Sequence, residues 1–165
     1  INNNIVLPTE IGNSLLSMPK LFKELNLSNS EDFTVIEDLL SGGGLKKIHK
    51  CISSEEQSPE EIVASYAKNE FSQKSIQIFL TSLSQILSEL ALVYMPGSGI
   101  YIAGGLMRSL HQFLDTDRFL KEFLVNRKSM HADVLKEIPL AIINQEMTCL
   151  HGSLNFINKF SLNLK

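Results

Sequence analysis

Three glycine clusters mark places where the backbone of this chain could hold a ligand. The first comprises Ser41, Gly42, Gly43 and Gly44 and precedes a predicted helix over residues 45–52. Backbone amides at a helix N-terminus can bind an anion, and glycine lets a ligand approach the backbone closely. A flexible turn would use the same glycines, so this cluster alone leaves both interpretations open.

The second cluster is Gly104 and Gly105, where a short apolar run ends and a helix is expected to begin. Ligands of open α/β sheets bind beyond the carboxyl ends of the strands, which is where this turn must lie. The spacing matches neither a dinucleotide fingerprint nor a P-loop, and tight packing of strand on helix would also require glycine here. The third cluster, at residues 96–99, is most simply a turn before the strand.

Two glutamates are candidates for binding a polyhydroxylated ligand. Glu10 ends a predicted strand, and Glu37 lies in an apolar stretch just before the first glycine cluster. An ionised carboxylate offers only acceptors, which suits the hydroxyl groups of a sugar. For either glutamate taken alone, simple exposure to solvent is the alternative.

The other reactive side chains form no pattern typical of a metal centre or of nucleophilic catalysis. Cys51 and Cys149 lie far apart and outside any C-x-x-C pair, which favours two reduced thiols over one long-range disulfide. Metal-ligand spacing is absent among the four histidines, and none is assigned a catalytic role: His49, His111, His131 and His151.

The composition is that of a globular domain. The chain has 165 residues, 44% of them hydrophobic and 20% charged, with a formal net charge of −3. Nothing in it indicates nucleic acid as a partner, and the longest apolar run, at residues 90–95, is too short to cross a membrane. With no secretion signal at the N-terminus, a cytoplasmic location is expected. The chain starts without Met close to a predicted strand, which favours a piece of a longer protein over a processed complete one.

Strand-like segments are few, and helices account for most of the rest. Strands are predicted at residues 5–9, 100–103 and 140–143, with a further possible strand at 35–40. The run at 100–103 is apolar throughout, so we expect it to be buried on both faces of a mainly parallel sheet.

The helices predicted from periodicity and capping make this one helix-rich α/β domain. Ser58 and Pro59 form a clear helix start, because serine caps and proline fits the first helical position. Apolar residues at helical spacing predict a long helix over 72–94, packed on a sheet or, alternatively, forming a coiled-coil seam. Shorter helices are predicted at 115–126, 131–137 and 148–160, with these expected core positions: Phe119, Leu120, Phe123, Leu124, Leu150, Leu154, Phe156 and Ile157.

The order of these features resembles the C-terminal portion of bacterial glucokinases over essentially all 165 residues. The most specific blocks are Glu-Asp-Leu-Leu-Ser-Gly-Gly-Gly-Leu, at 37–45, and Ile-Tyr-Ile-Ala-Gly-Gly-Leu, at 100–106. The resemblance implies one domain, residues 1–165, that is the helix-rich C-terminal lobe of the ribonuclease H-like, actin-like ATPase fold, with a short mixed sheet flanked by helices. The N-terminal lobe would be absent from this chain.

The resemblance also implies roles for particular residues. Glu10 and Glu37 match glutamates that bind glucose hydroxyls, and Gly104 and Gly105 match the glycines against which adenosine lies. Gly42 to Gly44 match a turn and helix start that line the same nucleotide-binding cleft. The implied ligands are a hexose, ATP and Mg²⁺, with most phosphate and metal contacts coming from the missing lobe, and a homodimer is a possible assembly.

The chain departs from the family pattern at Asn13, where the glucose-binding motif usually ends in histidine. Asparagine still donates and accepts hydrogen bonds, so sugar binding is retained in principle while strict specificity for glucose is not implied. The zinc motif of related repressor and kinase proteins is absent, which favours the glucokinase branch.

Three functional hypotheses follow. In the first, the full-length protein transfers the γ-phosphoryl group of ATP to the 6-hydroxyl of glucose. The general base and phosphate loops of the family precede this region, so the chain alone is expected to be inactive. In the second, favoured by Asn13, the fold is a non-catalytic sugar-binding regulatory module. The third, a helical dimerisation domain, leaves the glycines and glutamates unexplained.

Overall fold

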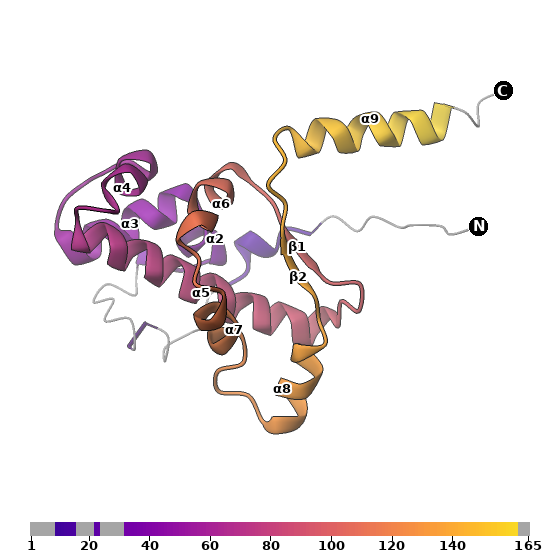
Figure 1. Ribbon diagram of the computed structural model, residues 1–165, viewed down its shortest axis with the longest axis horizontal. Coiled ribbons are helices and arrows are strands. Elements are labelled where there is room, and N and C mark those ends of the chain that lie inside the picture. Colours follow the sequence, from indigo (N-terminus) through magenta and orange to yellow (C-terminus); the bar gives the residue numbers. More distant parts are fainter. Residues whose placement is uncertain (1–8, 16–21, 24–31, 162–165) are drawn as a thin grey trace.

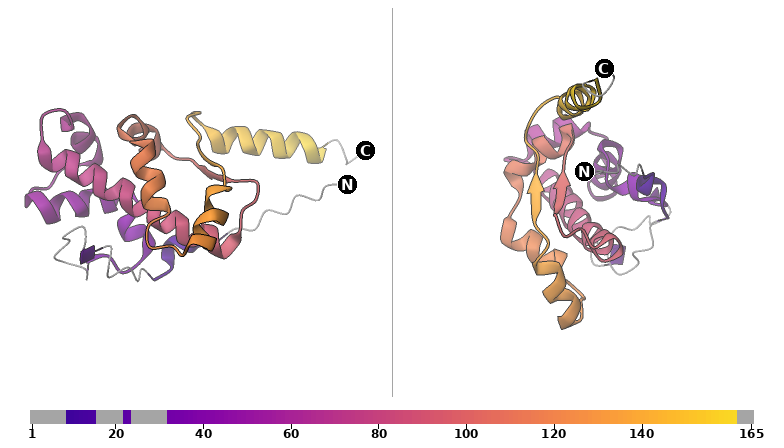
Figure 2. Two further views of the ribbon diagram at one scale, coloured as in Figure 1. Left: turned by 60° about the horizontal axis from the view of Figure 1, so that its bottom comes forward. Right: turned by 90° about the vertical axis from the view of Figure 1, so that its right-hand side faces the viewer.

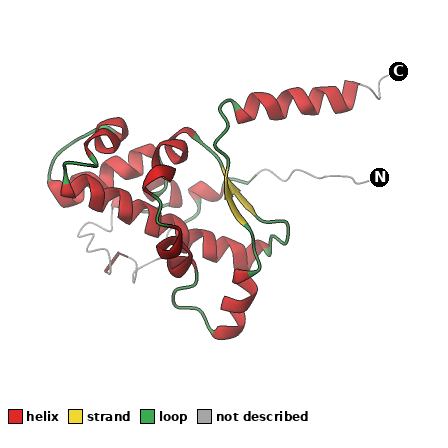
Figure 3. Ribbon diagram, in the orientation of Figure 1, coloured by secondary structure: helices red, strands yellow, loops and turns green. Residues whose placement is uncertain are grey.

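The computed structural model describes residues 9–15, 22–23 and 32–161 (Figure 1). Helices gather around one long helix, α5 (Glu70–Tyr94), and a small parallel sheet lies beside them. The last helix, α9 (Thr148–Ser161), extends away from this body (Figure 3). The helix-rich α/β architecture predicted from the sequence is confirmed.

Helix α5 forms the centre of the core. The Asn69 side chain caps its start by accepting hydrogen bonds from the amides of Phe71 and Ser72, and Met95 ends it in the left-handed conformation with φ 45°. By length and composition the helix could cross a membrane, but 67% of its most apolar window is buried inside the protein. The predicted helix at 72–94 is therefore a core helix.

The first half of the described chain comprises the 3₁₀ helix η1 (Ile11–Asn13), α2 (Ile36–Leu39), α3 (Gly42–Ser53) and α4 (Pro59–Ser65). Helices α3 and α4 pack against α5, while α2 packs on α3 and η1 packs on α2. Ser58 caps α4 as predicted, because its Oγ accepts from the Glu61 amide while the Glu61 carboxylate accepts from the Ser58 amide at 2.7 Å. Leu45 and Ile48 of α3 are fully buried in the core that these helices share with α5.

The sheet has two strands among the described residues, β1 (Ile100–Ile102) and β2 (Leu140–Ile142), and they run parallel (Figure 2). Both strands were predicted. The expectation that β1 is buried on both faces is wrong, because Tyr101 is 62% exposed while its neighbours on the strand are half-buried. One face of this sheet packs on the helices, and no described element covers the other.

The possible strand at residues 35–40 is also wrong, because this segment forms helix α2. Only Val35, just before the helix, makes a bridge, which is antiparallel to Leu15. The Asp38 carboxylate accepts from the Val35 amide at 3.1 Å, and this local hydrogen bond favours a helical turn over an extended chain. The strand predicted at residues 5–9 lies outside the described residues except for Thr9, which has no regular structure.

The second half of the described chain adds α6 (Gly105–Leu110), η3 (His111–Phe113), α7 (Thr116–Phe123) and α8 (Ser129–Lys136). Asp115 caps α7, and Phe119 and Phe123 are buried as predicted, whereas Leu120 is 43% exposed. Helix α7 lies against α5, where Ser84 Oγ donates to the Phe119 carbonyl at 2.6 Å.

The predicted core positions of α9 are not buried. Leu150, Leu154, Phe156 and Ile157 are each 50–59% exposed. Helical periodicity correctly indicates that these side chains belong to one apolar helix, but the helix projects beyond the described body instead of packing on it (Figure 2). The cysteines are as expected: Cys51 and Cys149 are both free thiols.

One buried polar group lies between α3 and α5. The His49 side chain is fully buried, and its Nδ1 lies 2.9 Å from Ser75 Oγ, while Nε2 has no partner among the described residues. Burial disfavours the charged imidazolium and lowers the pKa of His49 below its usual 6.5.

This pKa shift predicts an acid-sensitive core. As pH falls below about 6.5, the unfolded chain binds a proton at His49 and the folded chain does not. The free energy of unfolding therefore decreases by at most about 1.4 kcal/mol per pH unit until the pH reaches the lowered pKa of His49 in the folded chain. Urea unfolding at about pH 7.5 and about pH 5 measures this slope. His49→Leu should reduce the slope and the exposed control His131→Gln should leave it unchanged; equal slopes in all three proteins would refute the assignment.

Candidate functional site

The structure brings Glu10, Asn13 and Glu37 onto two adjacent elements. Helix η1 follows Glu10 directly and contains Asn13, and the Ile36 amide at the start of α2 donates to the Ser14 carbonyl at 3.1 Å. A Cβ placed on Gly12 would lie 3.6 Å from Glu37 Cβ, so η1 packs directly beside Glu37.

The three side chains of this cluster are all exposed and therefore accessible to a ligand. Asn13 Nδ2 donates to Glu10 Oε2 at 3.4 Å, and no described residue forms a hydrogen bond with the Glu37 carboxylate. Two carboxylates and one amide thus face solvent with most of their hydrogen-bonding capacity available, as binding of a hydroxyl-rich ligand requires.

Asp38, which the sequence analysis did not single out, holds α2 in place. Its carboxylate accepts from the Thr34 amide, the Thr34 hydroxyl and the Val35 amide, and it forms an ion pair with Lys47 Nζ at 2.6 Å. These interactions, with the Lys47 bond the largest, hold the pKa of Asp38 far below its usual range. Asp38 therefore fixes the segment that presents its neighbour Glu37 and ties it to α3.

Gly44 forms the tightest contact at the corner between α2 and α3. A Cβ on this buried glycine would lie 2.2 Å from the Leu39 carbonyl oxygen and 2.8 Å from that of Asp38. These are backbone atoms and cannot rotate away as a side chain would, so only glycine allows α3 to begin this close to α2.

Gly42 and Gly43, the predicted nucleotide contacts, occupy the first turn of α3. Ser41 caps this helix, with its Oγ accepting from the Gly44 amide at 3.0 Å. No described group accepts a hydrogen bond from the Gly42 or Gly43 amide. Two backbone donors at the positive end of a 12-residue helix are thus left for an outside acceptor.

Gly104 and Gly105, the second predicted nucleotide pair, stand at the end of β1 and the start of α6. Gly104 has φ 133°, a conformation that favours glycine, and nothing lies within 4 Å of a Cβ placed on it. No atom of α3 lies within 4 Å of such a Cβ on either glycine, so the two glycine pairs do not touch. Helix α4 contacts both α3 and α6 and connects the two sites.

The described residues offer no metal centre. No group of three or more His, Cys, Asp or Glu side chains that could hold a metal ion is found among them.

A matched pair of glycine substitutions tests the corner. Gly44→Ala should destabilise the protein by about 1–3 kcal/mol or more, because its Cβ meets fixed backbone. Gly43→Ala should be neutral or stabilising by up to about 1 kcal/mol, because its nearest contact is 3.6 Å away and alanine favours the helix. Urea unfolding compares the two, and equal effects would contradict the proposed constraint.

Removing the charge of Asp38 should lower the free energy of unfolding, because Asp38 links α2 to α3. Asp38→Asn loses the ion pair with Lys47 and should cost about 1–3 kcal/mol of stability, whereas the exposed pair of Asp133 and Lys136 predicts at most about 1 kcal/mol for Asp133→Asn. Because the folded pKa of Asp38 is lowered, its contribution is present above about pH 4 and decreases as pH falls below that value. Chemical unfolding across the acid range measures both effects, and a loss in Asp38→Asn no larger than in Asp133→Asn would exclude this role.

The proteins that this chain resembles are glucokinases. The sequence model of the family described as Glucokinase matches residues 3–159. The chain is 28% identical over 164 residues to a glucokinase-like protein of Xylella fastidiosa, covering 93% of this chain and 47% of that protein. It is 27% identical over 124 residues to a glucokinase of Chelativorans, covering 70% of this chain and 36% of that protein.

A crystal structure of glucokinase from an Antarctic psychrotroph has the same fold over 86% of this chain, with a TM-score of 0.73 and 22% identity. The match covers 47% of that structure, and the chain likewise spans about half the length, or less, of the curated relatives it matches. The family match extends over nearly the whole chain, and the chain belongs to the glucokinase family.

Proposed function

We propose that the protein to which this chain belongs transfers the γ-phosphoryl group of ATP to the 6-hydroxyl of glucose. The observation that carries the proposal is the placement of Glu10 and Glu37 on adjacent elements, with the glycine-rich start of α3 directly after α2. Family membership supports a sugar kinase as the general class.

In this proposal Glu10 and Glu37 accept hydrogen bonds from sugar hydroxyls and orient the sugar. Both side chains are exposed, and the segments that carry them are adjacent, because Gly12 of η1 packs beside Glu37 of α2. Asn13 contributes through its amide, which can donate to one hydroxyl and accept from another. Holding the acceptor hydroxyl in one position is a main contribution that a protein makes to phosphoryl transfer.

The nucleotide would lie across the two glycine pairs. The free amides of Gly42 and Gly43 suit a negatively charged or carbonyl acceptor. Nothing lies within 4 Å of a Cβ placed on Gly104, and only the far end of the Arg108 side chain, at 3.7 Å, lies near one placed on Gly105, so adenosine could approach the backbone at the end of β1. In this proposal most contacts to Mg²⁺ come from the second lobe, and no group of three or more His, Cys, Asp or Glu side chains that could hold a metal ion is found among the described residues.

We propose further that residues 1–165 form the C-terminal lobe of the protein and that a second lobe supplies the general base and phosphate loops. Two surfaces support this. The apolar side chains of α9, including Leu150 and Ile157, are half-exposed, and Tyr101 of β1 projects from an uncovered sheet face. Exposed apolar side chains that are grouped on one surface are typical of an interface. A second lobe that covers them would complete the cleft.

The alternative is a sugar-binding regulatory module without turnover. Asn13 favours it, because the usual family histidine is replaced by a neutral side chain beside Glu10. The full-length protein distinguishes the two: release of ADP with glucose and ATP supports the kinase, whereas hexose binding in calorimetry without ADP release supports the regulatory module.

Glu37→Gln in the full-length protein should weaken glucose binding about tenfold to a hundredfold. A charged acceptor is replaced by a neutral amide, and a hydrogen bond to a charged group contributes about 1.5–3 kcal/mol. Calorimetry with glucose measures the loss, and Glu137→Gln, an exposed carboxylate at the end of α8, is the matched control. If both variants bind glucose like the parent protein, Glu37 has no sugar-binding role.

A further inference from the structure

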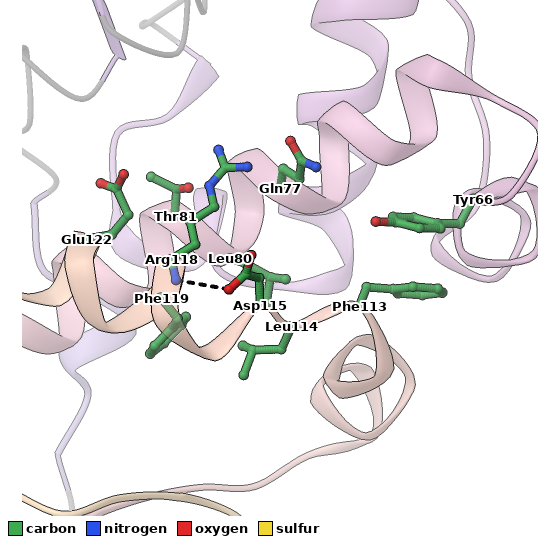
Figure 4. A pocket seen from close by; sticks show the side chains of 10 residues that line it. All are labelled: Tyr66, Gln77, Leu80, Thr81, Phe113, Leu114, Asp115, Arg118, Phe119 and Glu122. Carbon is green, nitrogen blue, oxygen red and sulfur yellow. Dashed lines mark hydrogen bonds between the residues drawn. The ribbon is translucent and has the colours of Figure 1, made fainter.

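A cavity of about 210 Å³ lies where α5, α7 and the end of α4 meet (Figure 4). Tyr66 follows α4, and Phe113 and Leu114 connect α6 to α7. The cavity is therefore at the opposite ends of α4 and α6 from Pro59 and Gly105, and none of the predicted sugar or nucleotide residues lines it.

The cavity contains polar groups that have no partner among the described residues. Thr81 is 93% buried, yet its hydroxyl makes no hydrogen bond to a described residue and lines the cavity. Arg118, at the opposite wall, is an exposed residue, and its guanidinium forms no ion pair or hydrogen bond with a described residue. Figure 4 shows the polar ends of Arg118 and Gln77 directed toward the same side of the cavity.

Two carboxylates complete the polar lining. One oxygen of Asp115 accepts from the Arg118 backbone amide at 3.0 Å, and one oxygen of Glu122 accepts from Gln85 at 2.9 Å. The second oxygen of each carboxylate has no bonding partner among the described residues. The cavity thus presents one free cation and two free carboxylate oxygens above an apolar floor that includes Leu80 and Phe119.

The charge balance selects the kind of ligand. A phosphate ester would place about two negative charges beside Asp115 and Glu122 and would be repelled. A purely apolar molecule would displace water from the Arg118 guanidinium and the Thr81 hydroxyl without giving either a new hydrogen-bond partner. A small zwitterion with an apolar side group matches the cation, the two carboxylates and the apolar floor. Its carboxylate can pair with Arg118, its ammonium group with a carboxylate, and its side group can pack on the apolar floor.

We infer that this cavity binds a free α-amino acid with an aliphatic side chain of about the size of leucine. Its carboxylate pairs with Arg118 and accepts from Thr81, its ammonium group donates to Asp115 or Glu122, and its side chain packs on Leu80 and Phe119. The site is smaller than the pockets that hold drug-sized ligands, which suits a metabolite of this size. The inference concerns this chain alone and does not depend on the proposed kinase activity.

Calorimetric titration of the full-length protein with L-leucine tests the site. The probes 4-methylpentanoate and 3-methylbutylamine lack the amino and carboxylate groups respectively. L-leucine should bind saturably below about 10 mM, and each truncated probe should bind about tenfold more weakly. Inorganic phosphate should not compete with L-leucine.

Three variants assign the contacts. Arg118→Gln should weaken L-leucine binding at least about tenfold. Asp115→Asn keeps the cap of α7, since asparagine caps as well as aspartate, but should weaken L-leucine more than 4-methylpentanoate. Lys121→Ala, on the same helix but outside the cavity lining, should bind like the parent chain. No saturable binding of L-leucine, or equal binding by Arg118→Gln and the parent, would overturn the inference.

Discussion

The close approach of α3 to the end of α2 is the constraint on which the candidate site depends. Gly44 allows this approach because any side chain there would overlap the carbonyl oxygen of Leu39. The Gly42 and Gly43 amides next to it have no acceptor among the described residues, and Asp38, paired with Lys47 of α3, fixes the segment that carries Glu37. The carboxylates proposed to bind the sugar and the free backbone donors are thereby fixed relative to each other, which is the kind of preorganisation that the proposed phosphoryl transfer requires.

Two surfaces away from this corner expose apolar side chains that a proposed second lobe could cover. The sheet has one uncovered face with Tyr101 exposed, and α9 extends from the body with its apolar side chains half-exposed. The chain also spans about half the length of its relatives. These observations support the proposal that the corner forms one wall of a cleft and that a second lobe forms the other.

Features that depend on neighbouring residues, such as helix caps and strands, could be predicted from the sequence. Contacts between residues far apart in the chain could not. The cap at Ser58, the length of α5 and both strands follow from signals that lie within a few residues of each other. Residues 35–40 have the composition of a strand, but Asp38 forms a helical turn and an ion pair with Lys47, which propensity does not include. Periodicity indicates which face of α9 is apolar without indicating what covers it. The proximity of Glu10 to Glu37 was expected only through the family resemblance, because their separation in sequence implies no contact.

The packing of η1 against α2 is the central claim, and a disulfide tests it most directly. Cβ atoms at positions 12 and 37 would be 3.6 Å apart, within the range of disulfides. In a chain with Cys51 and Cys149 replaced by serine, Gly12→Cys with Glu37→Cys should form an intrachain disulfide under mild oxidation, detected by mass spectrometry of the monomer. Each single variant should remain a free thiol in the monomer. Failure of the double variant to form this disulfide while it remains folded would contradict the account.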